Sequence, residues 1–391
     1  MLWMLLWSPV LWRSDLKVFD AVDEDLFHGP TIEIFAAALP SPDLSDYPSA
    51  TTPLYHLVMA PASWLTHHHI PSLRVLNLLI SGLALWVVVR ALTAWGSPKL
   101  GLLGGLLVGV SPYFVGPAVR LSTDNAALLT VFAALLASHP RTAQSPTRVA
   151  VWMTAAVWIR QVHAWLLAPM ALASLREPAR RKAWLLTGAV AASTLLPIFW
   201  LWGGATPPSF AKGHKTSMNI DVLIMSLGIL GLYACFFAPW IVRLLRTRTA
   251  LWQGLGVTLG SVTLLALHSM PWQHDPNKWG GALWSLSARF PELLGVSLVF
   301  WTTVPLGALA ILAFARHPDR RYGAFLSVVS CAFIAANMLS ARAYQKYTEP
   351  MLLFLLVSFL CEQPDIGKRA WLLPTLLCLL LAGVSLLRFM F

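Results

Sequence analysis

The sequence predicts an all-α polytopic membrane protein with about 11–13 transmembrane helices. Of its 391 residues, 57% are hydrophobic and only 12% are charged, and the mean hydropathy is +0.65. A soluble domain carries about 25% charged residues, so this chain lacks the charge needed to cover a water-facing surface. Its 19 tryptophans are typical of bilayer proteins, because the indole ring suits the headgroup boundary.

Most of the chain consists of apolar runs that are long enough to cross a bilayer. A weaker run, residues 148–175, is interrupted by Arg160, Gln161 and His163, so we interpret it as two short helices that meet at Arg160. Another weaker run covers residues 122–138. The clear runs are residues 73–92, 98–117, 183–202, 222–242, 250–267, 293–315, 322–339, 347–360 and 370–387.

The chain reads as one transmembrane domain, residues 1–391, with a long first loop. Residues 1–12 are apolar but lack a basic start and a cleavage pattern, so we expect a short first span rather than a cleaved signal, with the true start upstream. Residues 13–72 form an extracytoplasmic loop in which residues 54–65 lie along the membrane surface. Residues 73–391 form the helix bundle, and no internal repeat of the transporter type is found.

The positive charges define the orientation. Six basic loops hold 16 of the 28 lysines and arginines. If residues 148–175 form a hairpin, all six loops lie on one side, which the positive-inside rule assigns to the cytoplasm. The opposite face then carries nearly all of the side chains that can do chemistry, an asymmetry that a simple anchor does not need.

Other classes of function are disfavoured. The net charge of +11 is explained by orientation signals, so nucleic-acid binding is not expected. The four cysteines lie in apolar runs without metal-ligand spacing and are interpreted as buried hydrophobes. The run His67-His68-His69 is interpreted as interfacial, because adjacent residues on a helix point in different directions.

The first candidate site is the acidic run Asp23-Glu24-Asp25, which precedes Phe27 and His28. Three adjacent acids beside a membrane repel one another and need a partner. The run is either a general base that orients a hydroxyl nucleophile or a solvated loop.

Two further candidates place charges at membrane depth. Arg120 and Asp124 flank the start of the run at residues 122–138, where Asp124 acts either as a helix cap or in the site. Arg160, Gln161 and His163 lie inside an apolar run, where a charge costs about 2.5–3.5 kcal/mol. Arg160 therefore either faces a cavity or pairs with a structural carboxylate.

The last candidates are cationic. Lys212 and Lys215, with His214 between them, follow a glycine pair and suit a phosphate, although no nucleotide-binding P-loop is present. Residues 342–350 combine cations with tyrosines and either grip a phosphate or form an interfacial belt. The loop at residues 272–279 is a weaker contributor.

Together these motifs resemble the GT-C membrane glycosyltransferases that use polyprenyl-phosphate sugars, especially the terminal α-1,2-glucosyltransferases that use dolichyl-phosphate glucose. The resemblance follows the family's order over most of the chain. The register of the acidic pair stays open, as either Asp23-Glu24 with one inserted residue or Glu24-Asp25 in reversed order. The matching segments are Phe27-His28-Gly29-Pro30, Thr51-Thr52-Pro53-Leu54-Tyr55, Arg74-Val75-Leu76-Asn77-Leu78-Leu79, Ser122-Thr123-Asp124, Arg160-Gln161-Val162-His163 and Gly213-His214-Lys215.

The resemblance implies an inverting transfer of a glucose-like hexose to a hydroxyl of a lipid-linked or surface glycan, on the extracytoplasmic face. A carboxylate near Glu24 takes the acceptor proton while cations hold the leaving phosphate. The implied catalytic residues are Glu24, Asp25, Asp23 and Asp124. The implied donor-phosphate or substrate contacts are Arg160, Gln161, Lys215, His214, Arg342, Lys346, Tyr347 and His28.

The expected partners are a polyprenyl-phosphate sugar, a glycan or lipid-linked acceptor and membrane lipid. No cofactor is required, although the run of residues 23–25 is a conceivable metal site. The alternatives are a transporter or flippase for a lipid-linked anion, motivated by the same cations, and a structural subunit of a membrane complex. The expected location is a bacterial inner membrane, or the endoplasmic reticulum membrane in a eukaryote.

Overall fold

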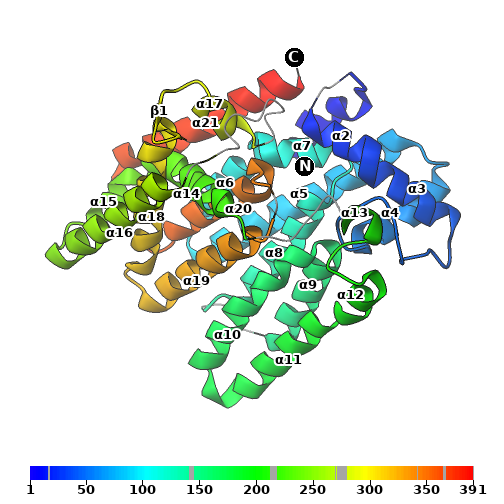
Figure 1. The fold of residues 1–391 in the computed structure, drawn as a ribbon, viewed down its shortest axis with the longest axis horizontal. Coiled ribbons are helices and arrows are strands. Elements are labelled where there is room, and N and C mark those ends of the chain that lie inside the picture. The colour runs from blue at the N-terminus through cyan, green and yellow to red at the C-terminus, as the bar shows by residue number, and fades with distance from the viewer. Residues whose placement is uncertain are drawn as a thin grey trace. The chain divides into compact units, whose positions relative to one another are not determined.

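Figure 1 shows the fold as a computed structural model, which describes residues 1–15, 18–140, 145–211, 218–268, 270, 280–340, 342–363 and 367–390. Nearly all regular structure in these residues is helical, which confirms the all-α class. The strands of the described part are β1 (Glu292–Leu293) and β2 (Val296–Ser297), which form an antiparallel hairpin with Glu292 opposite Ser297.

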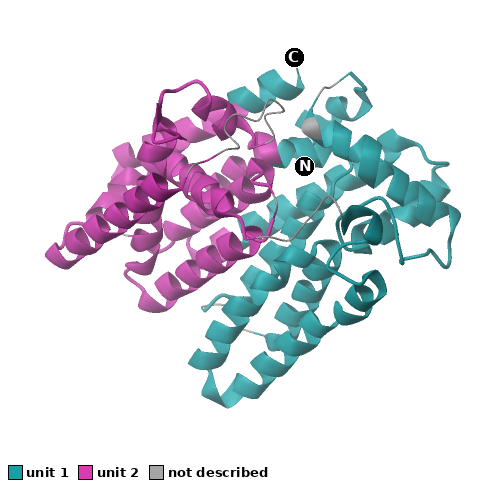
Figure 2. Ribbon diagram, viewed as in Figure 1, with its two compact units in different colours: residues 1–91, 114–215, 383–391 teal, residues 92–113, 216–382 magenta. Residues whose placement is uncertain are grey.

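The chain divides into two compact units, drawn in two colours in Figure 2. Unit 1 contains residues 1–91, 114–215 and 383–391, and unit 2 contains residues 92–113 and 216–382. Each unit is therefore built from segments that are far apart in the sequence.

Unit 1 carries the long first loop and the helices that follow it. Within this unit α4 packs against α3, and α8 against α9. Its elements, some of which continue into unit 2, are α1 (Leu2–Trp7), η1 (Ser8–Trp12), α2 (Phe19–Asp23), the π-helix η2 (Glu24–His28), α3 (Gly29–Ala37), α4 (Leu54–Leu65), α5 (Ile70–Trp95), α7 (Pro112–Val119), α8 (Thr123–Ser138), α9 (Pro146–Ile159), η3 (Gln161–Leu166), α10 (Leu167–Arg176), η4 (Pro178–Arg180), α11 (Arg181–Ser193), α12 (Leu196–Trp202) and α13 (Pro208–Ala211).

Unit 2 carries the later helices, among which α14 and α18 make the most extensive helix contact. The remaining elements lie wholly or partly in this unit. They are α6 (Pro98–Gly109), α14 (Ile220–Ala234), η5 (Cys235–Phe237), α15 (Ala238–Leu244), α16 (Arg248–Leu267), α17 (Ala282–Ser287), α18 (Leu298–Ala315), α19 (Arg320–Asn337), α20 (Gln345–Phe359), η7 (Lys368–Trp371) and α21 (Leu372–Phe389).

Six helical segments of the described residues are long and apolar enough to cross a membrane, and seven if α6 and α7, bent by 67° to each other, count as one span. The chain is therefore a polytopic membrane protein, with fewer full-length spans than the expected 11–13. Part of the difference arises because α8, α9 and α20 have only 16, 14 and 15 residues. The six segments are Ile70–Trp95, Pro178–Trp202, Ile220–Leu244, Arg248–Leu267, Leu298–Ala315 and Lys368–Phe389.

The weaker run at residues 148–175 contains the break that the sequence predicts. Helix α9 ends at Ile159, Arg160 has an extended backbone (φ −148°, ψ 114°), and η3 and α10 continue the chain. The extended residue turns the Arg160 side chain out of the helical register of α9.

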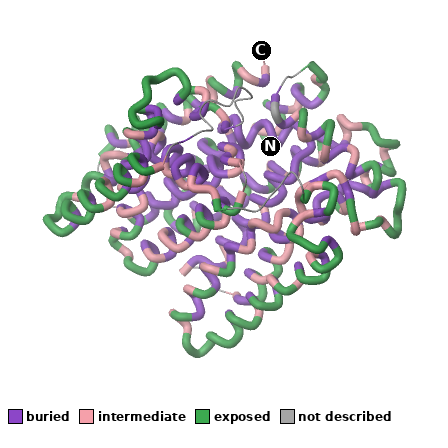
Figure 3. Tube along the Cα trace, viewed as in Figure 1, coloured by how far each residue is buried: buried purple, intermediate pink, exposed green. Residues whose placement is uncertain are grey.

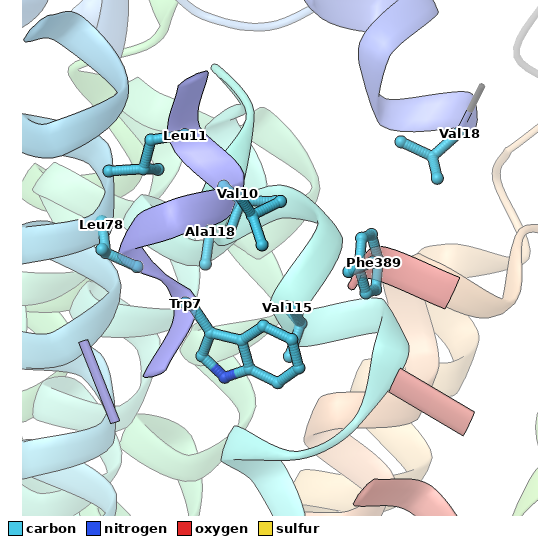
Figure 4. Packing of buried hydrophobic residues seen from close by; sticks show 9 residues of the cluster. Trp7, Val10, Leu11, Val18, Leu78, Val115, Ala118 and Phe389 are labelled. Atoms are coloured by element: carbon cyan, nitrogen blue, oxygen red, sulfur yellow. The ribbon is translucent and has the colours of Figure 1, made fainter. Parts of the chain in front are cut away.

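The two ends of the chain meet in one apolar cluster of unit 1, shown in Figure 4. Side chains from the first helical segment pack there against Phe389, near the end of α21. This cluster fixes the base of the first loop. Its labelled members are Trp7, Val10, Leu11, Val18, Leu78, Val115, Ala118 and Phe389.

In unit 2 two glycines allow α14 and α18 to approach closely. A Cβ on Gly231 would lie 1.8 Å from the Thr303 carbonyl oxygen, and one on Gly307 would lie 2.0 Å from that of Leu227. Burial varies strongly among the helices, as Figure 3 shows: α20 is buried along its length, whereas α16 is largely exposed. Because α16 is apolar, its exposed face suits contact with lipid.

Candidate active site

Glu24 begins the short π-helical segment η2, which joins α2 to α3. The N–H of Gly29 donates to the carbonyl of Glu24, which closes a wide turn of five residues. A Cβ on Gly29 would lie 2.9 Å from that carbonyl oxygen, so the turn requires glycine here. A π turn in an α-helix accommodates one additional residue and is frequent at functional sites.

The carboxylate of Glu24, 1% exposed, is enclosed by donors of unit 1. Arg74 donates through Nε, at 3.0 Å from Oε2, and through Nη2 to Oε1. Arg120 Nη1 lies 3.4 Å from Oε1, and the N–H of Leu121 donates to Oε2 over 2.7 Å. Two guanidinium groups and one amide therefore donate to this carboxylate.

The two arginines also tie the first loop to the helices. Arg74 Nη1 donates to the carbonyl of Leu11 over 2.8 Å, and Arg120 Nη2 donates to that of Arg13 over 2.7 Å. Arg120 is 2% exposed, and its Nε has no hydrogen-bond partner among the described residues. Burial and the neighbouring Arg74 lower the pKa of the Arg120 guanidinium, while Glu24 raises it. Glu24 therefore lies between two cations, Arg74 and Arg120.

A second, partly buried ion pair joins Asp124 to Arg160. Asp124 lies in the first turn of α8, where the Ser122 hydroxyl caps the helix and donates to Asp124 Oδ2 over 2.8 Å. Arg160 reaches Asp124 from the extended residue between α9 and η3. The Asp124 carboxylate is thus an ion-pair partner, while the capping role belongs to Ser122.

Gln161 anchors this region to two loops. Its Nε2 donates to the carbonyls of Ala50, at 2.9 Å, and Ala205, at 3.0 Å. Thr52 Oγ1 donates to the carbonyl of Val157 over 2.7 Å, so the first loop is fixed to α9. Both contacts hold the backbone near Arg160 in place.

His28 lies at the end of η2 and stacks on His56 of α4. Nδ1 of His28 lies 3.1 Å from Nε2 of His56, so one ring donates to the other. Burial, and then His28, lower the pKa of His56 well below its usual value, which keeps the imidazole neutral. Phe35 and Tyr55 present ring edges to His56, so the pair is a buried link between the acidic helix and α4.

The two acids beside Glu24 differ in exposure: Asp23 is half-buried and Asp25 is exposed. The charge of Asp25 acts on Arg120 and opposes, to a small extent, the lowering of the pKa of that arginine by burial. The three acids are therefore not equivalent, although they are adjacent in the sequence.

The C-terminal candidates belong to unit 2. Arg342 Nη1 donates to the Tyr344 hydroxyl over 3.2 Å, and Tyr344 packs edge-on against Tyr347. Lys346 is 7% exposed, and its Nζ lies 5.3 Å from the centre of the Tyr347 ring. Burial raises the pKa of Tyr344 to about 12, so this phenol is neutral at pH 7.

Several expected contributors lie outside the described residues. These are Lys212, His214, Lys215 and the loop at residues 272–279. Within the part of the chain that the structure describes, no group of three His, Cys, Asp or Glu side chains is arranged to hold a metal ion. His68 and His69 bond separately to Ser63 and Ser72, each over 2.8 Å.

Sequence reasoning named Arg120 as a candidate charge at membrane depth, but it did not assign a site role to Arg74, His56 or Asp20. Arg74 carried a detectable signal, since it is an arginine at the head of a long apolar run. Asp20 is 4% exposed and lies one helical turn before Glu24, and a Cβ on Gly116 would lie 2.3 Å from its Oδ2. The spacing Asp20–Glu24–His28 predicts one helical face, and all three side chains are buried.

The chain matches no protein-family model and no curated protein. Among solved structures it is similar to ArnT from Cupriavidus metallidurans in the apo state and to the same protein bound to undecaprenyl phosphate, with TM-scores of 0.41 and 0.42. Both alignments have 15% sequence identity and cover 92% of this chain and 76% of the other.

Proposed function

We propose that the protein is a membrane glycosyltransferase of the GT-C type, which transfers a hexose from a polyprenyl-phosphate sugar to a hydroxyl of a lipid-linked or surface glycan. The observations that support this proposal best are two ion clusters in unit 1: the buried cluster of Glu24 with Arg74 and Arg120, and the partly buried pair of Asp124 with Arg160. Such charges are costly in an apolar protein and mark functional sites in membrane proteins.

We assign the general base to Asp23. The π turn at residues 24–28 holds one residue more than an ordinary α-helical turn. We equate this extra residue with the insertion relative to the family pattern. The register in which Asp23-Glu24 is the acidic pair and the insertion follows it is therefore favoured. Both oxygens of Glu24 are engaged by Arg74, Arg120 and Leu121, which gives Glu24 a positioning role. A base works best when it is partly shielded from water. Asp23 is half-buried and meets this condition, whereas Asp25 is exposed.

The reaction proceeds by one inverting displacement. The base takes the proton of the acceptor hydroxyl, the hydroxyl oxygen forms the bond to the anomeric carbon, and the bond from that carbon to the phosphate oxygen breaks. The electron pair of the broken bond stays on the phosphate. The proposed contacts of the departing phosphate are Arg160, Arg342, Lys346 and Lys215, with Tyr347, Gln161, His28 and His214 as substrate contacts, and they act by positioning and charge stabilisation.

The test is to incubate the purified protein with a panel of polyprenyl-phosphate sugars and to measure released polyprenyl phosphate. Asp23→Asn should lower kcat by about 10²–10⁴, the usual contribution of a positioned base. Asp25→Asn is the matched control, since it removes the same charge two residues away and should leave kcat within about threefold. Equal activity of Asp23→Asn and the wild type would refute the base, and transport without sugar transfer in vesicles would favour the transporter.

A further inference from the structure

Glu349 is a fully buried carboxylate in α20 that the proposed reaction does not use. Three neutral groups of unit 2 donate to it. The Ser111 hydroxyl lies 2.6 Å from Oε1, the Tyr233 hydroxyl lies 2.7 Å from Oε2, and Gln345 Nε2 lies 2.5 Å from Oε2. The three donors come from different parts of the unit, so this network joins three of its segments.

Gln345 carries the network further, to the segment 280–284. Its Oε1 accepts from the N–H of Leu283 over 2.9 Å, and its backbone N–H donates to the carbonyl of Gly280 over 3.0 Å. Trp284 Nε1 donates to the carbonyl of Ala343 over 3.1 Å. The segment 280–284 is therefore tied to the segment 343–345 by side chain and backbone together.

Gly281 shows how close this contact is. Its φ of +101° lies in the region that favours glycine, and a Cβ there would lie 2.7 Å from both the Tyr113 hydroxyl and Gln345 Cβ. The N–H of Ala282 donates to the same hydroxyl over 2.5 Å. Ser111 and Tyr113 thus support the two ends of one network.

The network includes the first residue of α20 and so adjoins the cations of the proposed phosphate site at residues 342–347. Gln345 is the first residue of α20, Lys346 follows it directly, and Arg342 lies three residues before it. No side chain caps this end of α20. The hydrogen bond between Gln345 and Glu349, one turn apart, therefore stabilises the first turn on which Lys346 and Tyr347 stand.

From this geometry we propose that Glu349, with Tyr233 and Gln345, is a positioning residue for the donor-phosphate contacts at residues 342–347. The inference depends on the proposed function, because it assigns those contacts to the donor. Glu349 acts through the backbone. The network holds the first turn of α20 and the segment 280–284 in one arrangement, so that the cationic side chains are already ordered when the phosphate binds.

The test compares two matched substitutions of tyrosines that donate to α20, Tyr233 of α14 and Tyr322 of α19. Tyr233→Phe removes the buried hydroxyl bonded to Glu349, whereas Tyr322→Phe removes a buried hydroxyl bonded to the Ser358 carbonyl, over 2.8 Å, at the other end of the same helix. Both lose one buried hydrogen bond. Tyr233→Phe should raise the KM for the donor about three- to tenfold with kcat within about twofold, and Tyr322→Phe should change neither beyond about twofold.

A second measurement does not depend on activity. Hydrogen exchange of the amides of Leu283 and Gln345 should accelerate about tenfold in Glu349→Ala, less in Glu349→Gln, and stay unchanged in Tyr322→Phe. Equal effects of the two tyrosine substitutions on KM, or unchanged exchange in Glu349→Ala, would overturn the positioning role while leaving the transferase intact. A wild-type protein that transfers no sugar overturns both proposals.

Discussion

Glu24 is the residue whose environment differs most from that of its neighbours. It is buried between Arg74 and Arg120, whereas Asp25 is exposed. A buried pair that loses one partner leaves an uncompensated charge, which costs about 3–5 kcal/mol. At an exposed position the loss of a carboxylate costs about 0.5 kcal/mol or less.

Glu24→Ala should therefore lower the free energy of unfolding by about 3–5 kcal/mol. Asp25→Ala is the control and should change it by about 0.5 kcal/mol or less. Denaturant unfolding of both variants in the same detergent checks the difference. Equal stability of the two variants would mean that the arginines do not depend on Glu24.

The buried histidine pair predicts a loss of stability in acid. Burial, and then His28, hold the pKa of His56 well below 6.5, so the unfolded chain binds the proton more readily than the folded protein does. This contribution is fully present above pH 6.5 and is lost as the pH falls, by up to about 1.4 kcal/mol per pH unit. His56→Phe keeps a ring among Phe35 and Tyr55 but removes the titration, so its thermal unfolding should be less sensitive between pH 6.5 and 5. Identical pH dependence in both proteins would contradict this assignment.

At the scale of single residues, the sequence indicates which side chains are chemically important. It does not indicate which residues are their ion-pair partners. Glu24, Asp124 and Arg160 stand out because charges are rare in apolar surroundings. Their partners depend on helix contacts: Arg74 reaches Glu24 across 50 positions of sequence, and Arg160 reaches Asp124 across 36. Pairing over such distances cannot be derived from spacing alone.

At the scale of elements, the π turn η2 joins two α-helical segments with one extra residue between them. Asp20 before it, Glu24 at its start and Phe35 after it are all buried. Removing one residue from a π turn restores an ordinary α-helix, whereas removing one from an α-helix rotates everything beyond it by about 100°.

Deletion of Leu26, an exposed residue within the turn, should therefore lower the free energy of unfolding by about 1–2 kcal/mol at most. Deletion of Glu33, an exposed residue of α3, is the control and should prevent folding, because it turns Ile32 and Phe35 out of register. Circular dichroism and thermal melting of both variants check this. A deletion of Leu26 that is as damaging as that of Glu33 would contradict the π-turn explanation.

The contact between α14 and α18 gives a second prediction about elements. Gly307→Ala places a methyl group against the Leu227 carbonyl and should cost about 1–3 kcal/mol of stability or more, as overpacking does. Gly256→Ala in α16 is the matched control, because a Cβ there meets open space, and it should stabilise the helix by about 0.5–1 kcal/mol. Melting temperatures that fall equally in both variants would show that the close approach is unimportant.

The positions of the long apolar helices were predictable because the hydropathy of the sequence identifies such segments directly. The runs at residues 73–92 and 222–242 correspond to the spans Ile70–Trp95 and Ile220–Leu244, and the break at Arg160 lies where its charge predicts it. The π turn was not predictable, since its pattern depends on a single hydrogen bond from Gly29 to Glu24. The bend between α6 and α7 also lay inside one apolar run and left no signal in hydropathy.

For the whole molecule, the charge asymmetry of the sequence predicts the orientation in the membrane. It predicts that the basic loops lie in the cytoplasm and that the first loop and the ion-pair clusters lie on the opposite face. A lipid carrier presents its phosphate sugar at the membrane surface, so the proposed reaction requires the acidic helix and Arg160 to lie on that same face.

The most direct test of this arrangement is the sidedness of two single cysteines in a cysteine-free background. Ser41→Cys marks the first loop and Ala179→Cys marks the basic segment before α11, and both positions are exposed in unit 1. In sealed right-side-out vesicles a membrane-impermeant maleimide should label Ser41→Cys at once, and Ala179→Cys only after permeabilisation. Labelling of both cysteines from the same side, or of Ala179→Cys alone, would contradict the proposed extracytoplasmic site.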